Sequence, residues 1–237
     1  MSDFFADKNW NGLSNVVEAD TEFIPLISPE DEDRMNKEKV PEKLSILPLR
    51  NNVLFPGVVI PITLGRDKSI KLIQDAYKGN KIIGVVSQKD SSVEDPVYND
   101  LFKIGTVAQI VKMLKMPDGS STIIIQGKKR LKLVEELSND PYLIAKVEEF
   151  DEKRLKKVSK ESIALYDSLK DMALNIIKNS PNIPSEASFA IKNIESPNFL
   201  VNFISSHMNA KVDEKQNMLE EPNINQRAKL LMKHLNK

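Results

Sequence analysis

Pro48-Leu49-Arg50-Asn51-Asn52-Val53-Leu54-Phe55-Pro56-Gly57-Val58-Val59-Ile60-Pro61 decides how the front of this chain folds. The stretch is apolar and rich in β-branched residues, but three prolines and one glycine interrupt it. Proline lacks a backbone N–H, so we expect each one at a strand end, an edge or a bulge. Phe55-Pro56-Gly57 indicates a tight turn, because proline presets φ at the first central position and glycine accepts a positive φ at the second. The sequence therefore predicts a sharp corner, with Leu44–Leu49 leading into Val53–Phe55 before it and Val58–Leu64 after it.

The segments that follow this corner predict a β-rich domain over residues 44–150. Short apolar runs alternate with turn signals, and Arg66–Tyr77 has the apolar spacing of a helix, with Gly79 suited to its C′ position. Pro117-Asp118-Gly119 predicts a hairpin, and Gly127–Arg130 predicts a second turn. The strands expected after the helix are Lys81–Gln88, Leu101–Met116 from Gly105 onward, Ser120–Gln126, Leu131–Val134 and Pro141–Glu148.

The apolar spacing then changes to three and four residues, which predicts an all-helical domain over residues 151–237. A long helix is expected to begin within Asp151–Lys160 and to end before Pro181 and Pro184. Ser196-Pro197 has the residue types of a helix cap and first helical residue. The apolar stripe of the long helix is expected to comprise Ile163, Tyr166, Leu169, Ala173, Ile176 and Ile177. Further helices are expected over Asp213–Glu221, ended by Pro222, and from Asn223, where Gln226 suits a capping box. The fold class is therefore α+β.

Residues 1–43 differ in composition from the rest and are expected to be an acidic, flexible extension. They hold eleven acids and five bases, a net charge of −6, whereas residues 44–237 carry +6. The run Glu30-Asp31-Glu32-Asp33 favours a solvated tail. Two apolar islands break it, Phe4-Phe5 with Trp10 and Phe23–Ile27, and these could dock on a partner or on the domain itself.

Composition also excludes several classes of protein. The 237 residues include no cysteine, so disulfides, thiolate catalysis and cysteine-ligated zinc are ruled out. No apolar run approaches the roughly 18 residues of a membrane span, and the N-terminus lacks the features of a signal peptide, which predicts a cytoplasmic protein. The formal net charge of +0 argues against a dedicated nucleic-acid binder.

A search for catalytic motifs finds none that holds. Gly79 and Gly84 have the spacing of a phosphate loop, but Val85-Val86 stands where lysine and serine or threonine are required. The two histidines, His207 and His234, lie on different predicted helices and are expected to pack at the surface or the edge of the core.

The charged clusters have similarly plain interpretations. Glu135-Glu136 and Glu148-Glu149 are neighbours on strands, so their side chains point to opposite faces and cannot act on one substrate. Lys128-Lys129-Arg130 is the densest basic cluster of the β-rich part, and without aromatic neighbours it is expected to be a solvated turn. The sequence predicts no catalytic, cofactor-binding or metal-ligating residue, so these residues describe a two-domain binding or assembly module.

Several motifs, in order along residues 44–237, resemble the N-terminal domain of the Lon family of ATP-dependent proteases, also called protease La. The opening stretch carries the first match as Pro48-Leu49-Arg50-x-x-Val53-Leu54-Phe55-Pro56-Gly57-x-x-x-Pro61. The later matches are Gly65-Arg66-Asp67-Lys68-Ser69, Val86-Ser87-Gln88-Lys89-Asp90, Asp100-Leu101-Phe102-x-Ile104-Gly105-Thr106-Val107-Ala108, Leu114-x-Met116-Pro117-Asp118-Gly119, Gln126-Gly127-x-x-Arg130, Ser196-Pro197-x-x-Leu200-Val201 and Glu214-Lys215-Gln216-x-x-Leu219-Glu220. The departures are Phe102, where tyrosine is common, and the acidic extension.

The resemblance implies a β-rich, PUA-like pseudo-barrel followed by a helical bundle, at the N-terminus of a longer protein. Lon proteases are cytoplasmic homohexamers in bacteria that use ATP and magnesium to unfold damaged and regulatory proteins, and cut them with a Ser–Lys dyad. The phosphate loop and the dyad of that family lie outside the residues matched here. The resemblance therefore implies a module that recognises unfolded or damaged proteins and helps assembly, and that alone is a monomer or weak oligomer.

Two alternatives stay open on the sequence. A stand-alone Lon-like module binding a small ligand or RNA rests on analogy of fold alone. A complete enzyme has no motif in its support. The candidate contacts to an unfolded client are the loop Ser91–Asp100, the island Phe23–Ile27, and Met113 or Met116, although methionine in a strand is more often a core residue.

Overall fold

The proline-glycine corner joins two strands of the sheet, as the sequence predicts. The computed structural model describes residues 27–115, 120–151, 159–179 and 185–236. β1 (Lys43–Leu49) precedes the corner and β2 (Val59–Leu64) follows it. Gly57 has φ +82°, and the Val58 N–H donates to the Phe55 carbonyl oxygen over 3.2 Å, which closes the turn. The expected strand over Val53–Phe55 is wrong: these residues form no strand, and their buried side chains fill the core instead.

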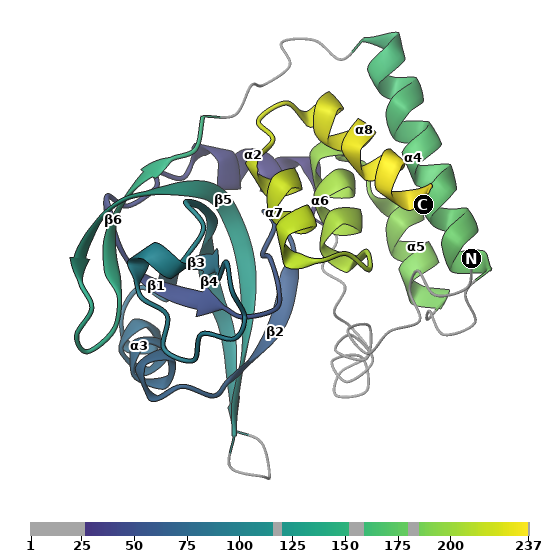
Figure 1. The fold of residues 1–237 in the computed structure, drawn as a ribbon. Helices are drawn as coiled ribbons and strands as arrows, with labels where there is room; N and C mark the ends of the chain where they lie inside the picture. The colour runs from purple at the N-terminus through teal and green to yellow at the C-terminus, as the bar shows by residue number, and fades with distance from the viewer. Residues whose placement is uncertain (1–26, 116–119, 152–158, 180–184, 237) are drawn as a thin grey trace.

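Five strands close into a barrel, and β2 extends it at one side (Figure 1). The remaining strands are β3 (Ile82–Ser87), β4 (Ile104–Lys115), β5 (Ser121–Ser138) and β6 (Ile144–Glu149). Their order is β2-β5-β4-β3-β1-β6, and β6 also pairs with β5, which completes the ring. Only β1 and β3 are parallel. β2 pairs only with β5, so among the described residues it has a free edge.

β5 corrects two sequence expectations at once, because it runs unbroken through the expected turn at Gly127–Arg130. A Cβ on Gly127 would lie 2.3 Å from the Phe55 carbonyl oxygen. The glycine is therefore needed for the close passage of the Phe55 segment across the strand, and not for a turn. Leu131–Val134, expected as a separate strand, is the continuation of β5. The expected hairpin at residues 117–119 lies outside the described residues, although β4 and β5 on either side of it are antiparallel.

Two helices begin at the caps that the sequence predicts. Ser196 caps α6 (Pro197–His207) by accepting from the Phe199 N–H, and Asn223 caps α8 (Ile224–Leu235). α3 (Asp67–Lys78) is confirmed, but Gly79 ends it with φ −95°, so no left-handed glycine is involved. The other helices are α2 (Pro29–Lys37), η1 (Tyr98–Asp100), α4 (Lys160–Lys178), α5 (Ser185–Asn193) and α7 (Val212–Glu220).

Two details of the helical part differ from the expected pattern. Ile163, placed on the buried stripe of α4, is 50% exposed, because the stripe begins only at Tyr166. α5 was not expected at all, since it follows two prolines and carries a short apolar face. The buried residues of that face include Ala187, Ala190 and Ile191. A helix this short is held by its packing rather than by propensity.

The acidic run of residues 30–33 lies in helix α2 and not in an unstructured tail. Ser28 accepts from the Asp31 N–H at the helix start, and the acids stand in the first turn, where the helix dipole favours negative charge. Ile27 and Met35 anchor the helix in the core. The division of the chain into residues 1–43, 44–150 and 151–237 stays a prediction.

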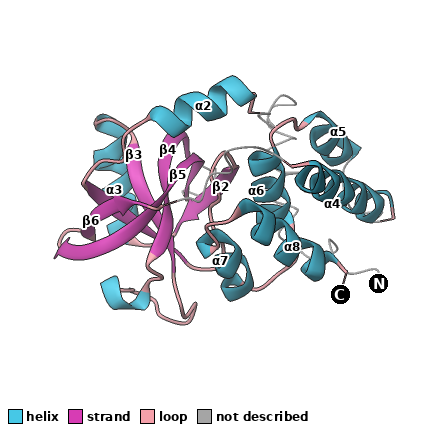
Figure 2. Ribbon diagram, turned by 90° about the horizontal axis from the view of Figure 1, so that it is seen from above, coloured by secondary structure: helices cyan, strands magenta, loops and turns pink. Residues whose placement is uncertain are grey.

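One continuous hydrophobic core extends from the barrel into the helices. It includes Phe55 of the corner and Ile123 of the sheet together with Phe199 of α6 and Leu231 of α8. A second, smaller cluster lies on the β1, β3 and β6 side of the barrel. Viewed from above, the helices α4 to α8 gather on one side of the sheet, and α6 and α7 lie nearest to it (Figure 2). The joint between the two halves is therefore packed, and several polar contacts cross it.

Candidate functional site

The Phe55-Pro56-Gly57 turn forms the first contact between the barrel and the helices. A Cβ on Gly57 would lie 2.8 Å from the ring of Phe199 in α6, so the bare glycine backbone packs directly on that helix. The Pro56 carbonyl oxygen accepts from Asn202 Nδ2 over 3.0 Å, and Asn202 Oδ1 accepts from Arg227 Nη1 over 2.6 Å. The most distinctive motif of the sequence is thus a packed contact between the barrel and the helices, which we call a joint. It places α6 and α8 against the sheet.

Arg130 makes the second contact and overturns the expectation of a solvated basic turn. Its side chain is 1% exposed, and Nη1 donates to the carbonyl oxygens of Leu219 and Glu221 over 2.6 and 2.9 Å. The guanidinium group also lies 4.5 Å from the centre of the Phe150 ring. A guanidinium can satisfy several carbonyls at once because its donors are fixed in a fork. Arg130 therefore ties β5 to the end of α7.

The neighbouring lysines of that cluster are also held in place. Lys129 is buried, forms an ion pair with Glu149 over 2.6 Å, and donates to the Glu38 carbonyl oxygen over 3.0 Å. Lys128 lies 3.9 Å from the Glu38 carboxylate. The paired acids of the sequence serve as their partners, since Glu148 likewise pairs with Lys132 on the neighbouring strand. These groups stabilise the sheet and do not converge on a substrate.

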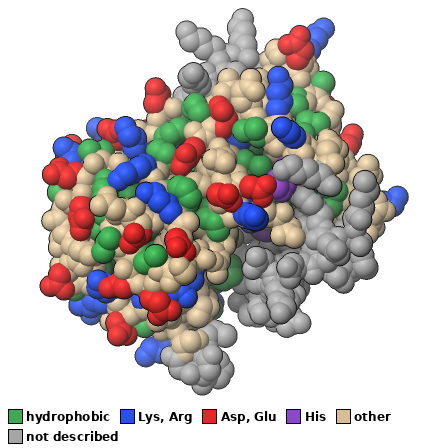
Figure 3. Space-filling view, in the orientation of Figure 1, with side chains coloured by type: hydrophobic (Ala, Val, Ile, Leu, Met, Phe, Trp, Pro, Cys, Tyr) green, Lys and Arg blue, Asp and Glu red, His purple; other side chains and the backbone are tan. Residues whose placement is uncertain are grey.

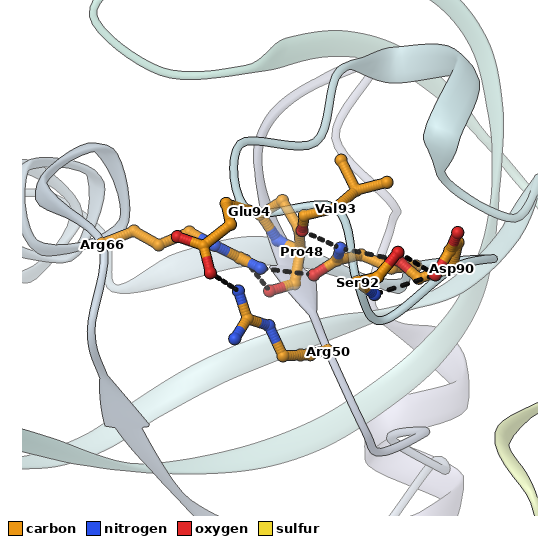
Figure 4. A network of polar contacts seen from close by, with 8 residues as sticks. Pro48, Arg50, Arg66, Asp90, Ser92, Val93 and Glu94 are labelled. Atoms are coloured by element: carbon orange, nitrogen blue, oxygen red, sulfur yellow. Dashed lines mark hydrogen bonds and ion pairs between the residues drawn. The ribbon is translucent and has the colours of Figure 1, made fainter.

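Arg66 and Gln88 form a clamp at the base of the loop Ser91–Asp100 (Figure 4). Arg66 Nη2 donates to Gln88 Oε1 over 2.5 Å, and Gln88 Nε2 donates to the carbonyl oxygens of Asp90 and Val93 over 3.2 and 2.9 Å. Burial, aided by the nearby Arg50, lowers the pKa of Arg66. Hydrogen bonds from Ser92 lower the pKa of Asp90, so this carboxylate stays ionised while it holds the turn. The clamp fixes the position of the loop.

The loop itself presents an acidic rather than an apolar surface. Its exposed side chains include Glu94 and Asp95, while Pro96 and Tyr98 turn inward and are buried. Val97 is its one apolar side chain classed as exposed among the described residues, at 41%. Glu94 lies 3.8 Å from Arg50, and Asp95 bonds Lys68 over 2.8 Å. This loop therefore offers little apolar area for an unfolded chain.

The other residues predicted to contact a client are buried, partly buried or outside the described residues. Of the island Phe23–Ile27, only Ile27 is described, and it is buried in the core. Met113 is partly buried and packs against the core, as methionines on strands commonly do. Met116 lies outside the described residues. The candidates that the structure describes, the loop Ser91–Asp100, Ile27 and Met113, therefore do not form one exposed apolar surface.

A surface that the sequence analysis missed lies on the outer face of β2, β5 and the second half of β4. Val59, Pro61, Ile124 and Leu114 are half-buried there, and Val111, at a β-bulge, is 48% exposed. None of these five side chains belongs to either hydrophobic core. The signal was present in the sequence, because residues 59–64 and 123–125 are apolar without alternation, which is typical of strands covered on both faces.

A cleft of about 930 Å³ lies between α2, the middle of β5 and the start of α6. Ile27, Gly57 and Phe199 contribute to its lining, and Arg130 and Arg227 reach it from the joint. The walls carry both signs of charge, acidic on α2 and basic on β5. These charged residues are Glu32, Asp33, Lys128 and Lys129. Its size lies within the range of ligand pockets.

Three further titratable groups, His207, Lys215 and His234, lie on α6, α7 and α8. His207 is half-buried against the Phe203 ring, its Nδ1–H donates to the Phe203 carbonyl oxygen over 2.8 Å, and loss of solvent lowers its pKa to about 4. Burial lowers the pKa of Lys215 to about 8, and its Nζ donates to the Ser206 carbonyl oxygen over 2.7 Å. His234 lies beside Glu214 at 3.5 Å. Each of these groups fixes helix ends, and the described residues contain no group of three or more acids and histidines placed to hold a metal ion.

Charge is mixed over the visible face of the molecule. Basic and acidic side chains alternate across the barrel half, with hydrophobic side chains between them (Figure 3). None of the described helices is long and apolar enough to cross a membrane.

Two solved structures similar to this chain are Lon N-terminal domains. The N-terminal domain of the Mycobacterium avium complex Lon protease matches 82% of this chain and 98% of its own, with a TM-score of 0.67 and 18% identity. A Lon N-terminal domain protein from Xanthomonas campestris matches 81% of this chain and 97% of its own, with a TM-score of 0.59 and 16% identity. These likenesses support the fold: a barrel followed by helices.

Sequence relatives point to the same family with much higher identity. A Lon protease of Flavobacterium johnsoniae is 56% identical over 219 residues, and one of Cytophaga hutchinsonii is 48% identical over 216 residues. The matches cover 92% and 91% of this chain but 27% of each relative, so the chain spans about a quarter of their length. The family model described as the ATP-dependent protease La (LON) substrate-binding domain matches residues 43–237. By these matches, the chain belongs to the family of Lon substrate-binding domains.

Proposed function

We propose that this chain binds protein substrates for an ATP-dependent protease of which it forms the N-terminal part. The observation that carries the proposal is the match of residues 43–237 to the Lon substrate-binding domain. The joints at Gly57 and Arg130 support it, because a surface that must hold a client for an enzyme elsewhere works best on rigid elements.

The finer parts of the proposal concern the longer protein. In it, ATP and magnesium act in a separate part that unfolds damaged and regulatory proteins, and a Ser–Lys dyad cuts them. The present chain contributes recognition and helps a cytoplasmic homohexamer to assemble. Both roles are consistent with relatives named Lon protease that are nearly four times as long as the matched region.

Direct binding tests the proposal. The probe is a globular protein that has been reduced, carboxymethylated and labelled with fluorescein, so that it cannot refold, and its native form is the control. Fluorescence anisotropy should show saturable binding of the unfolded probe to the 237-residue chain and none of the native form. Equal anisotropy for both forms at chain concentrations up to 100 times those of the probe would contradict the proposal.

The cleft of about 930 Å³ favours a second candidate, a stand-alone module that binds a small ligand or RNA. For RNA, affinity should fall steeply with salt, because each phosphate contact releases counterions. The mixed charge of the cleft walls argues for a weak salt slope. A thermal-shift screen of metabolites and a salt titration with single-stranded RNA separate this candidate from client binding.

A further inference from the structure

We propose that the outer face of β2, β5 and the second half of β4 holds an extended client segment that is apolar and either uncharged or acidic. The inference rests on the proposed function and assigns it a surface and a class of segment. We call this surface the outer sheet face; its apolar members are Val59, Pro61, Val111, Leu114 and Ile124.

Register and burial show that these side chains share one face. Pro61 pairs with Ile124, and Ile124 pairs with Lys112, which follows the bulge residue Val111. The opposite face of the same strands carries Ile123, which is fully buried. Because paired residues in an antiparallel sheet point to the same side, the outer sheet face turns away from the core that the other face fills. The register places the polar side chains of Thr122 and Gln126 on the same face, so the surface is mixed and only partly exposed. Apolar surface left exposed on a sheet in this way can mark an interaction site.

The free edge of β2 is a poorer candidate than its face. An added strand needs donors and acceptors along the edge, and Pro61 in the middle of β2 has no N–H. Proline on an edge strand is a common device against strand addition. A client would therefore rest on the face through side-chain contacts, and not extend the sheet.

The charge around the face selects the client. Residues 59–64, 104–115 and 121–126 contain no acid, and their two charged residues, Lys112 and Lys115, are both exposed. Lys112 pairs with Ile124 and therefore shares the outer sheet face, whereas Lys115 pairs with Ser121 and points to the other side of the sheet. The loop Ser91–Asp100, by contrast, is acidic and carries exposed Glu94 and Asp95. An acidic group beside the apolar stretch of a client would meet Lys112 favourably, whereas a basic group would be repelled.

Two valines provide a matched pair of variants. Val111 and Val134 are both half-exposed, at 48% and 45%, and both stand at bulges, but Val134 lies far along β5, outside the outer sheet face. Val111→Glu places a charge on the proposed surface, and Val134→Glu places the same charge elsewhere. Neither side chain belongs to a hydrophobic core, so both variants should keep the fold, as checked by circular dichroism and melting temperature.

Three fluorescein-labelled peptides serve as probes, each an extended fourteen-residue segment rich in leucine and valine with a flanking pair of aspartates, serines or lysines. Wild-type chain and Val134→Glu should bind the aspartate peptide most tightly and the lysine peptide least. Val111→Glu should weaken binding by at least about tenfold. Lys112→Glu should reverse the order of the peptides, because the repulsion is then transferred to the aspartates.

The possible outcomes separate the surface from the function. Equal loss of affinity in the two valine variants, or none in either, would overturn the assignment of the outer sheet face while leaving client binding intact. Absence of binding to any peptide and to the unfolded probe would overturn both. If Val111→Glu instead changes the molar mass of the chain in light scattering, the occupant of the face is a second copy, and the client proposal fails.

Discussion

Nη1 of Arg130, in the middle of β5, lies 2.6 Å from the carbonyl oxygen of Leu219 in α7, 89 positions along the chain. The contact joins the barrel to the helices through a fully buried cation that binds backbone oxygens. A charged hydrogen bond of this kind is expensive to break, because its carbonyl partners would then be buried without a donor.

Replacing Arg130 should therefore destabilise the whole chain. Arg130→Met keeps much of the side-chain volume but removes both carbonyl contacts, and we expect a loss of about 2–4 kcal/mol in the free energy of unfolding. Urea denaturation followed by fluorescence measures it. The matched control is Lys132→Met on the same strand, whose partner Glu148 is half-exposed, and it should cost about 0.5 kcal/mol. Similar losses in both variants would show that the joint is not held by Arg130.

A methyl group on Gly57 should also weaken the joint. Its φ of +82° is unfavourable for alanine, and the Cβ would lie 2.8 Å from the Phe199 ring. Gly57→Ala should lower the free energy of unfolding by about 2 kcal/mol or more, from backbone strain and crowding together. Gly65 has nothing within 4 Å of such a Cβ, so Gly65→Ala should be neutral or slightly stabilising. An unchanged melting temperature in Gly57→Ala would contradict the packing described here.

Gln88 should control the order of the loop Ser91–Asp100. Gln88→Leu removes the donors to the Asp90 and Val93 carbonyl oxygens. We expect amide exchange in residues 90–97 to accelerate at least about tenfold, because the loop can then open locally without global unfolding. Hydrogen exchange with mass spectrometry measures this, and Ser91→Ala is the control. Exchange that rises equally in the sheet would mean a global rather than a local effect.

His207 should make the chain sensitive to acid. Its pKa is lowered to about 4 from 6.5, so between these values the unfolded state binds a proton that the folded state does not. Stability is therefore lost as pH falls from about 6.5 to 4, by about 3 kcal/mol. His207→Gln should flatten this part of the profile of unfolding free energy against pH. His234→Gln should keep the contribution that comes from His207, and an equally steep profile in both variants would refute the assignment.

Local chemistry explains the features that sequence reasoning predicted. The turn at Pro56-Gly57 and the cap at Ser196 depend on a few adjacent residues, whose φ preferences and side-chain donors act within one turn of chain. The resemblance to Lon proteases also followed from such motifs, and family membership is confirmed. Arg66 and Gln88, which belong to two separate motifs of the sequence, form a hydrogen bond with each other.

Other features could not be read locally. Gly127 resembled a turn glycine, but it sits within a long strand because the Phe55 segment must pass close to it. The basic cluster beside it resembled a solvated turn, and Arg130 is buried because the end of α7 covers it. The outer sheet face is a similar case: the unbroken apolar run of residues 59–64 indicates apolar side chains on both faces of the strand, but only the assembled core decides which face stays outside.

The sequence by itself determined the corner at Pro56-Gly57, the starts of α6 and α8 and the family, because each depends on short-range steric and hydrogen-bonding rules. Only the tertiary structure decided that Arg130 is a joint and that Val111 and Ile124 face outward. Burial depends on which distant segment arrives to cover a residue, and that is a property of the assembled core rather than of any stretch of chain.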